Sequence, residues 1–240
     1  VEWVVAEEDA QKMLKEYELK FFDKNLNAEQ KEEALSILRN GCHSLQEKGA
    51  ELILPSCTGQ VEYADALNCP RIHFMAGLRP KGVDQVLLQD TYEKNLAWAA
   101  EQAAANKRDV LIEPINTRDI PDFFLNTQAE AHRIVQKLGT SNLKVQFDLY
   151  HCQVVEGDVA TKIRQYLPTG RVGHFQIAGV PQRHEPDIGE LNNAYLFEVI
   201  DEVAAAFGWN GWVGCEYRPA RGTKSRATSE GLGWLRPFVG

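Results

Sequence analysis

The chain has 240 residues, of which 44% are hydrophobic and 25% are charged, a composition typical of globular domains. Its longest apolar runs, such as Leu96 to Ala100, have about five residues, whereas a membrane-spanning helix needs about 20. These runs exclude a helical membrane protein. The formal net charge is −8, and the basic residues form no stripe, which argues against a nucleic-acid partner.

The five cysteines are odd in number, scattered and never spaced as C-x-x-C. This pattern argues against a disulfide framework and a zinc knuckle, and it favours a reducing, cytoplasmic compartment. The chain opens with Val1-Glu2-Trp3-Val4-Val5, without an initiator methionine or a basic-then-apolar leader. We therefore expect that the sequence begins within a strand and that an N-terminal piece is absent from it.

Short apolar runs alternate with longer amphipathic stretches, which is typical of a parallel sheet built from strand–helix units. The expected strands are 1–5, 18–22, 51–55, 71–76, 110–114, 144–148, 172–178 and 212–217. The expected helices are 7–16, 28–48, 85–106, 127–138, 159–166 and 194–207. Thr127 and Glu130 have the capping-box spacing at the start of one helix.

Eight strand candidates favour a closed (β/α)8 TIM barrel, an α/β fold that commonly uses about 200 to 250 residues. A doubly wound open sheet is the structural alternative, but neither G-x-G-x-x-G nor a Walker-type loop is present to hold its nucleotide. Because no linker separates the units, we expect a single domain over 1–240, with an incomplete or atypical N-terminal βα unit.

Four expected strands end on a carboxylate or a carboxamide, at intervals of 35, 28 and 40 residues: Glu113, Asp148, Gln176 and Glu216. Alternation along a strand turns these four inward and sends the preceding residues toward the helices, namely Ile112, Phe147, Phe175 and Cys215. Any one of the acids alone is more often a loop or capping residue. Four in one register predict a shared site at the carboxyl ends of the strands, where barrel enzymes keep their sites.

This set offers only oxygen ligands, which suit Mg²⁺ or Mn²⁺ and are poor for Zn²⁺. A single divalent cation would offset most of three crowded negative charges. We therefore expect one divalent cation, Mg²⁺ or Mn²⁺, as the cofactor, with these four residues as ligands.

Further polar groups near the same strand ends are candidates for binding a substrate: His73, His151, Arg183 and His184. His151 lies three residues after Asp148, close enough to face the same cavity, and His73 ends an expected strand. Arg183 and His184 lie in the loop beyond Gln176, where a guanidinium could hold a substrate carboxylate. Solvated loop charges are the commoner case for such residues.

The other histidines have simpler interpretations. His174 is expected inside the barrel below the ligand layer, and His43 and His132 are expected on helix surfaces. Six scattered histidines are too few for a phosphodiester-cleaving barrel with several zinc ions.

From about residue 68 to 238 the sequence resembles the hydroxypyruvate isomerase family, including the 2-oxo-tetronate isomerases, within the xylose-isomerase-like barrels. The motifs recur in order with the family's spacing, in 69–77, 111–116, 147–151, 173–179, 183–186, 214–217 and 230–234. Two segments depart from the family: Val1 to Val5 resembles its second strand, and 221–229 is longer than its short turn.

The resemblance implies a TIM barrel with Glu113, Asp148, Gln176 and Glu216 as metal ligands. Glu113 and Glu216 would also serve as proton donor and acceptor. His151 and Arg183 correspond to substrate-contacting positions in the related ketose epimerases.

The implied activity is the isomerisation of a small keto- or hydroxy-acid by enediolate proton transfer. The substrate pair would be hydroxypyruvate and tartronate semialdehyde, or 2-oxo-tetronate and 3-oxo-tetronate. The alternatives are a ketose 3-epimerase, which Gln176 in place of a histidine disfavours, and a non-catalytic sugar-acid-binding barrel. The expected partner is a small keto-acid or sugar-acid, with neither nucleic acid nor membrane, and a homo-oligomer is compatible with the pattern.

Overall fold

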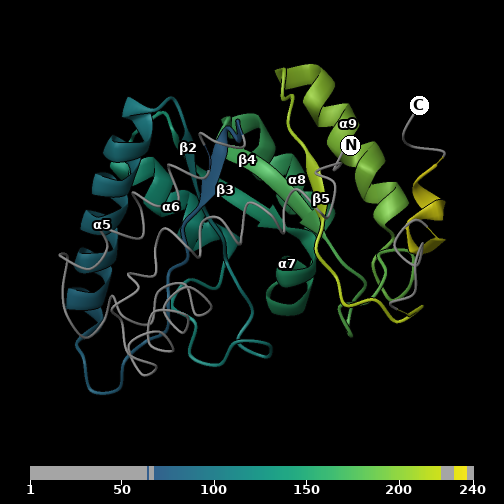
Figure 1. Ribbon diagram of the computed structural model, residues 1–240, viewed down its shortest axis with the longest axis horizontal. Coiled ribbons are helices and arrows are strands. Elements are labelled where there is room, and N and C mark those ends of the chain that lie inside the picture. Colours follow the sequence, from purple (N-terminus) through teal and green to yellow (C-terminus); the bar gives the residue numbers. More distant parts are fainter. Residues whose placement is uncertain (1–63, 65–67, 223–229, 237–240) are drawn as a thin grey trace, which may run out of the picture.

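The computed structural model describes Ala64, residues 68–222 and residues 230–236. Its strands form one parallel sheet in the order β1 (Arg71–His73), β2 (Asp109–Ile112), β3 (Leu143–Asp148), β4 (Val172–Ile177) and β5 (Val213–Cys215). Each strand pairs with the next along the chain, which is the order of strands in a barrel. Figure 1 shows this curved sheet at the centre of the molecule, between α5 and α9.

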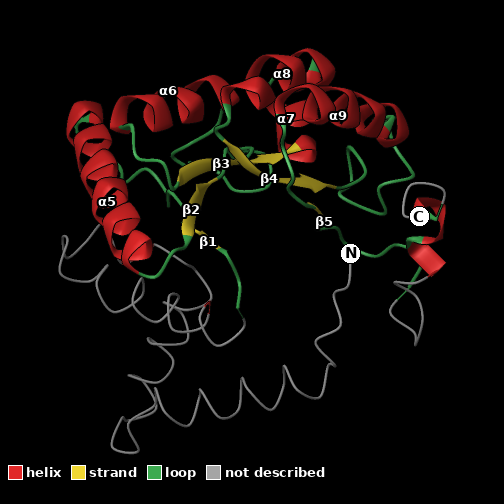
Figure 2. Cartoon of the chain, turned by 90° about the horizontal axis from the view of Figure 1, so that it is seen from above, coloured by secondary structure: helices red, strands yellow, loops and turns green. Residues whose placement is uncertain are grey.

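The helices are α5 (Gln85–Ala105), α6 (Gln128–Leu138), α7 (Leu149–Val155), α8 (Val159–Tyr166) and α9 (Asn193–Phe207), with 3-10 turns η2 (Leu167–Thr169) and η3 (Gly233–Leu235). Figure 2 shows α5, α6, α8 and α9 in an arc around the outer side of the strands. None of these helices in the described part of the chain is both long enough and apolar enough to cross a membrane.

Local sequence explains where several helices begin and end. Asp84 accepts hydrogen bonds from the backbone of Val86 and Leu87 at the start of α5. The Thr127 hydroxyl accepts from the Glu130 N–H at 3.2 Å, so the predicted start of α6 is confirmed. Gly139 ends α6 in the left-handed conformation, with φ of 68°, which a residue without a side chain adopts at low cost.

The core lies between the strands and this outer arc. Phe147 and Phe175 are fully buried with their ring centroids 5.5 Å apart, in a cluster with residues of α8 and α9. Ile112 is buried in a second cluster with residues of α5 and α6. These three residues face the helices as predicted. Cys215 lines a groove with Phe197 of α9, on the same side, but it is exposed.

Five of the predicted strands are present, although β1 and β5 are shorter than 71–76 and 212–217. Residues 149–155, for which the sequence analysis predicted no helix, form α7. The expected strands 1–5, 18–22 and 51–55 and helices 7–16 and 28–48 lie outside the described residues. The single domain over 1–240 stays a prediction.

Candidate active site

The strand register brings the four predicted ligand positions to one edge of the sheet. Asp148 is the last residue of β3 and pairs with Gln176 of β4, which in turn pairs with Gly214 of β5. Glu113 directly follows β2, and Glu216 directly follows β5. The carboxyl ends of parallel strands therefore carry all four side chains to the same end of the fold.

Glu113 and Asp148 form a buried acidic pair at this edge. Their exposed fractions are 3% and 0%, and one oxygen of each, Oε1 of Glu113 and Oδ2 of Asp148, has no hydrogen-bond partner. Asp148 Oδ1 caps α7 by accepting from the backbone of Tyr150 at 2.7 Å and His151 at 3.2 Å. One carboxylate oxygen thus fixes the helix, and the other is left for a different partner.

Burial controls the ionisation of this pair. Burial raises the pKa of Asp148 to about 6, although the nearby Arg183 charge opposes the rise. Burial, and then repulsion from Asp148 and Glu216, raise the pKa of Glu113 well above its usual range. Two buried carboxylates with unpartnered oxygens need a compensating positive charge to be ionised together, and a divalent cation fits this donor set.

Helix α7 brings His151 to the same pair. One ligand atom from each of Glu113, Asp148 and His151 lies within 4.8 Å of the others. His151 Nε2 is 3.8 Å from Asp148 Oδ2, and burial lowers the pKa of His151 to about 3, so the ring is neutral at physiological pH. The structure confirms that His151 faces the carboxylates, but from the first turn of a helix.

Gln176 is connected to the acidic pair through a residue that the sequence analysis did not single out. Gln146 Nε2 donates to Gln176 Oε1 at 2.7 Å, and the Gln146 side chain also hydrogen-bonds to Glu113. Gln146 is 5% exposed and lies two residues before Asp148, on the same strand face. That alternation was a signal that could have identified it.

Glu216 differs from the buried pair because its side chain is 58% exposed. Its Oε2 lies 2.9 Å from Arg183 Nη2, and it repels Glu113 and Asp148 electrostatically. Its carboxylate is not one of the three ligand groups within 4.8 Å of each other. Arg183 therefore holds Glu216 at the rim of the acidic pair.

Two inward-facing histidines line the same interior. His73 ends β1, and its Nε2 lies 3.4 Å from Glu113 Oε2. Burial, and then the His174 charge, lower the pKa of His73 to about 4. His174 lies two residues before Gln176 on β4, where Gly214 leaves room for it: a Cβ on Gly214 would be 3.0 Å from His174 Nε2.

Two other histidines lie away from the acidic pair. His184 Nδ1 lies 2.9 Å from the carbonyl oxygen of Arg218, so this ring fastens the loop that carries Arg183. A direct contact of His184 with substrate stays a prediction. The prediction that His132 lies at the surface is wrong: it is 4% exposed and stacks on Tyr166 at 4.1 Å, because this face of α6 packs against α8. His43 lies outside the described residues.

A polar network beside His151 was also missed. Asn116 is fully buried and contacts His151, while Asp119 accepts a hydrogen bond from the Tyr150 hydroxyl at 2.7 Å. Burial acts to raise the pKa of Asp119, but the hydrogen bonds from Tyr150 and Asn116 outweigh it and lower that pKa. The polar residues that follow Glu113 in the same loop were the sequence signal that could have identified this network.

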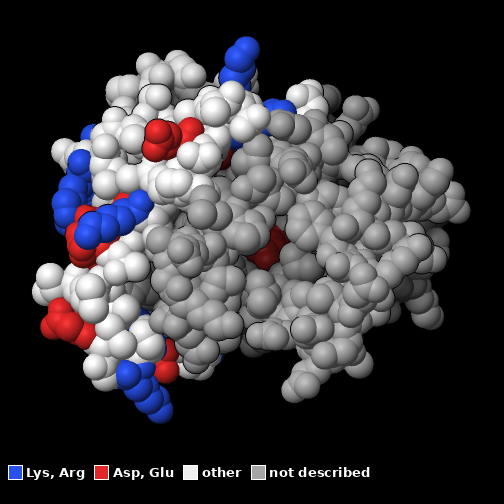
Figure 3. Space-filling view, turned by 60° about the vertical axis from the view of Figure 1, so that its left-hand side comes forward, with Lys and Arg blue, Asp and Glu red and all other residues white. Residues whose placement is uncertain are grey.

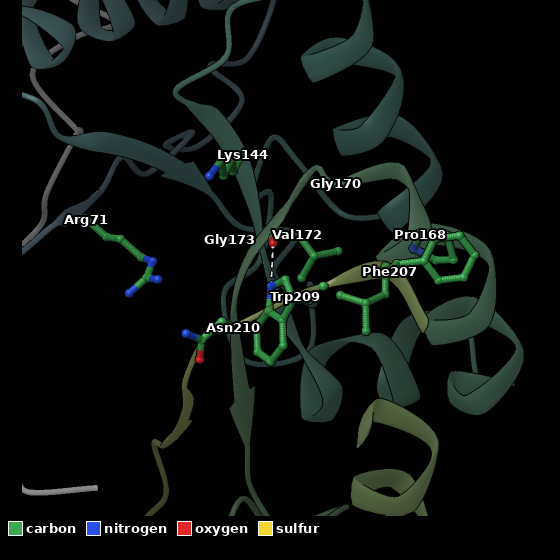
Figure 4. Close-up of a pocket in the computed structure, with 12 residues that line it drawn as sticks. Arg71, Lys144, Pro168, Gly170, Val172, Gly173, Phe207, Trp209 and Asn210 are labelled. Carbon is green, nitrogen blue, oxygen red and sulfur yellow. Dashed lines mark hydrogen bonds between the residues drawn. The ribbon is translucent and has the colours of Figure 1, made fainter. Parts of the chain in front are cut away.

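A pocket at the opposite end of the sheet is separate from this site. Figure 4 shows Arg71, Lys144, Val172 and Trp209 at the amino ends of β1, β3 and β4, where Trp209 Nε1 donates to the Val172 carbonyl at 2.9 Å. The acidic pair lies at the carboxyl ends. Figure 3 shows basic and acidic side chains intermixed over the described part of another face.

The fold and the arrangement of these side chains match a known family of barrel proteins. A profile described as "Xylose isomerase-like TIM barrel" matches residues 3–238, and the chain belongs to that family. The predicted TIM barrel is thereby confirmed.

Two curated relatives are named isomerases. The chain is 55% identical over 180 residues to a 2-oxo-tetronate isomerase of Cupriavidus necator, covering 75% of this chain and 65% of that protein. It is 38% identical over 178 residues to the hydroxypyruvate isomerase of Escherichia coli, covering 74% of this chain and 65% of that protein. The chain thus spans slightly less than two thirds of the length of these relatives. The predicted resemblance is confirmed.

Solved structures agree with the fold. A Brucella melitensis protein described as AP endonuclease, family 2, has a TM-score of 0.71 and 38% identity, covering 83% of this chain and 71% of that chain. An L-ribulose 3-epimerase has a TM-score of 0.62 at 16% identity, covering 95% of this chain and 82% of that chain. This second likeness shows the shared barrel alone.

Proposed function

We propose that this protein is an isomerase that moves a proton between adjacent carbons of a small keto- or hydroxy-acid. The observation that carries the proposal is the buried pair of Glu113 and Asp148, each with an unpartnered oxygen, at the carboxyl ends of barrel strands. The relatives named 2-oxo-tetronate isomerase and hydroxypyruvate isomerase support the same reaction class. The substrate would be hydroxypyruvate or 2-oxo-tetronate.

We assign one divalent cation, Mg²⁺ or Mn²⁺, to Glu113, Asp148, Gln176 and Glu216. The unpartnered oxygens of the buried pair and the all-oxygen donor set support this assignment. When bound, such a cation supplies positive charge that stabilises negative charge on the oxygens of the substrate.

Glu113 and Glu216 would exchange the proton with the two substrate carbons. Glu113 approaches from the buried side, and Glu216 approaches from the exposed side, where Arg183 fixes its orientation. Base positioning of this kind typically contributes about 10² to 10⁴-fold to the rate. One of the two carboxylates is thus buried and the other is exposed.

The remaining candidates would hold the substrate oxygens. The Arg183 side chain is 14% exposed and packs over the Tyr150 ring, with Cζ 5.3 Å from the centroid, so the position of its guanidinium beside Glu216 is constrained. Its guanidinium can bind the carboxylate of a keto-acid in a fixed geometry. His73 and His151, both neutral and beside the acidic pair, would contact the neighbouring oxygens.

The test is the Glu216→Gln variant, assayed with hydroxypyruvate, 2-oxo-tetronate and a free ketohexose. We expect an intact fold and a loss of at least about 100-fold in isomerase turnover, because the amide cannot accept the proton. Glu202→Gln on α9, which breaks an exposed pair with Arg164 of α8, is the matched control and should retain full turnover. Near-normal rates in Glu216→Gln would refute the assignment.

The same assay separates other activities. Turnover of the ketohexose alone would indicate a ketose 3-epimerase instead of a keto-acid isomerase. Substrate binding without incorporation of solvent deuterium would instead indicate a non-catalytic barrel that binds sugar-acids.

A further inference from the structure

The orientation of the His151 ring is determined by Asn116. His151 is 2% exposed, and its Nδ1 lies 3.3 Å from the backbone nitrogen of Asn116 and 2.6 Å from the Asn116 side-chain nitrogen Nδ2. A backbone N–H can only donate a hydrogen bond, so this longer contact favours an accepting Nδ1, and the side chain is the closer of the two groups. A flipped ring would place a C–H against both buried donors and leave them unsatisfied.

The Asn116 amide cannot reverse to offer its oxygen to His151. Its Oδ1 accepts from the Asp119 N–H at 2.8 Å, and its Nδ2 also donates to Asp119 Oδ2 at 3.3 Å. Reversal would place the amide oxygen against the Asp119 carboxylate and its nitrogen against an N–H. Both groups that face His151 Nδ1 are therefore donors.

A neutral imidazole carries one proton, so an accepting Nδ1 places that proton on Nε2. Nε2 is the nitrogen on the side of the acidic pair, 3.8 Å from Asp148 Oδ2. A protonated ring nitrogen has no lone pair for a cation. His151 is therefore close enough to share an ion with Glu113 and Asp148. Its hydrogen bonding nevertheless makes Nε2 a hydrogen-bond donor and not a metal ligand.

We propose that Asn116 is a positioning residue that fixes His151 as the Nε2–H tautomer. His151 then offers an N–H to an oxygen of the substrate, and the ligands of the cation are oxygen atoms alone. The use of the N–H in turnover rests on the proposed function, whereas the tautomer is a property of the protein without metal or substrate.

The first experiment is NMR of histidine side chains in ¹⁵N-labelled protein without metal. In the wild type we expect the His151 proton on Nε2 and an unprotonated Nδ1. Asn116→Asp replaces the closer, side-chain donor with an acceptor and leaves only the backbone N–H, 3.3 Å away, to oppose a proton on Nδ1, so a measurable fraction of His151 should carry its proton on Nδ1. A wild-type ring protonated on Nδ1, or a tautomer unchanged in Asn116→Asp, would overturn the proposal.

Two further variants, one test and one control, complete the NMR experiment. Asn116→Ala removes the side-chain donor to His151 without adding an acceptor there, although it also removes the contacts of the amide with Asp119, and a fraction of Nδ1-protonated His151 should appear; if none appears, the side chain does not fix the tautomer. Asn142→Asp is the matched control, because Asn142 donates to the carbonyls of Ala100 and Arg108 at the other end of the sheet. It should leave the His151 signals unchanged.

The second experiment measures Mn²⁺ binding and turnover. Pulsed electron paramagnetic resonance should show no histidine nitrogen on the bound ion, and His151→Gln should keep the wild-type Mn²⁺ affinity. A nitrogen coupling that His151→Gln abolishes would overturn the proposal.

Asn116→Asp should lower kcat about 10- to 100-fold, and Asn142→Asp should not. Equal kcat in Asn116→Asp and the wild type would overturn the positioning role. If Mn²⁺ does not bind, the proposed cation site fails, and the NMR result still decides the tautomer.

Discussion

Replacing Asp148 with asparagine should stabilise the metal-free protein at neutral pH. The carboxylate is fully buried beside Glu113, and its Oδ2 has no hydrogen-bond partner. The cap on α7 survives the change, because asparagine caps a helix about as well as aspartate. The variant therefore removes an unfavourable buried charge and keeps the start of the helix.

The magnitude follows from the pKa of Asp148, which burial raises from 3.8 to about 6. Because the folded pKa is the higher one, the folded protein binds more protons between those values, and stability falls as the pH rises through that window. One pKa unit corresponds to about 1.4 kcal/mol, so the ionised carboxylate costs on the order of 3 kcal/mol at pH 7. The Tm of Asp148→Asn should rise by about 6 to 12 °C.

Thermal and urea unfolding in a chelator, at neutral pH and near pH 4, would measure this effect. The gain should be present at neutral pH and nearly absent near pH 4, and added Mn²⁺ should stabilise the wild type more than the variant. Asp84→Asn changes the cap of α5, where the carboxylate is exposed, and should give no gain. A variant no more stable than the wild type at neutral pH, or equally stabilised at both pH values, would contradict the reasoning.

The other stability predictions concern the core and a helix cap. Phe175→Ala should lower the free energy of unfolding by about 3 to 5 kcal/mol, because its ring is fully buried against Phe147 and Trp209; a loss below about 1 kcal/mol in urea titration would argue against this packing. Thr127→Ala should cost about 1 kcal/mol by the same measurement, since it leaves the Glu130 N–H without its cap. Thr161→Ala, at an exposed position within α8, should be neutral or stabilising, and equal losses in the two threonine variants would argue against the cap.

Periodicity was sufficient to locate the strand ends that carry the site. Alternation along 144–148 correctly turned Phe147 toward the helices and Asp148 inward, because successive side chains of a strand point to opposite faces. The intervals between acids predicted successive βα units, and the register confirms Asp148 opposite Gln176. The direction of a strand residue is a local property, so the sequence is enough to predict it.

Helix α7 shows the limit of that reasoning. A stretch of seven residues is too short for a helical period to stand out, and Asp148 was interpreted only as a ligand candidate. In the structure the same residue also caps α7, and this second role places His151 in the site. The surface assignment of His132 failed for a related reason, since a helical pattern does not tell which neighbouring helix covers which face.

The order of residues along the chain therefore determined the repeated βα architecture and the inward direction of the oxygen-bearing side chains. Only the tertiary structure decided that Asn116 faces His151 across 35 residues of sequence, that Arg183 holds Glu216 at an exposed rim, and that Glu113 and Asp148 are buried together. Side-chain direction follows from local backbone geometry. Burial, hydrogen-bond partners and the resulting pKa values depend on how separate strands and helices pack against one another.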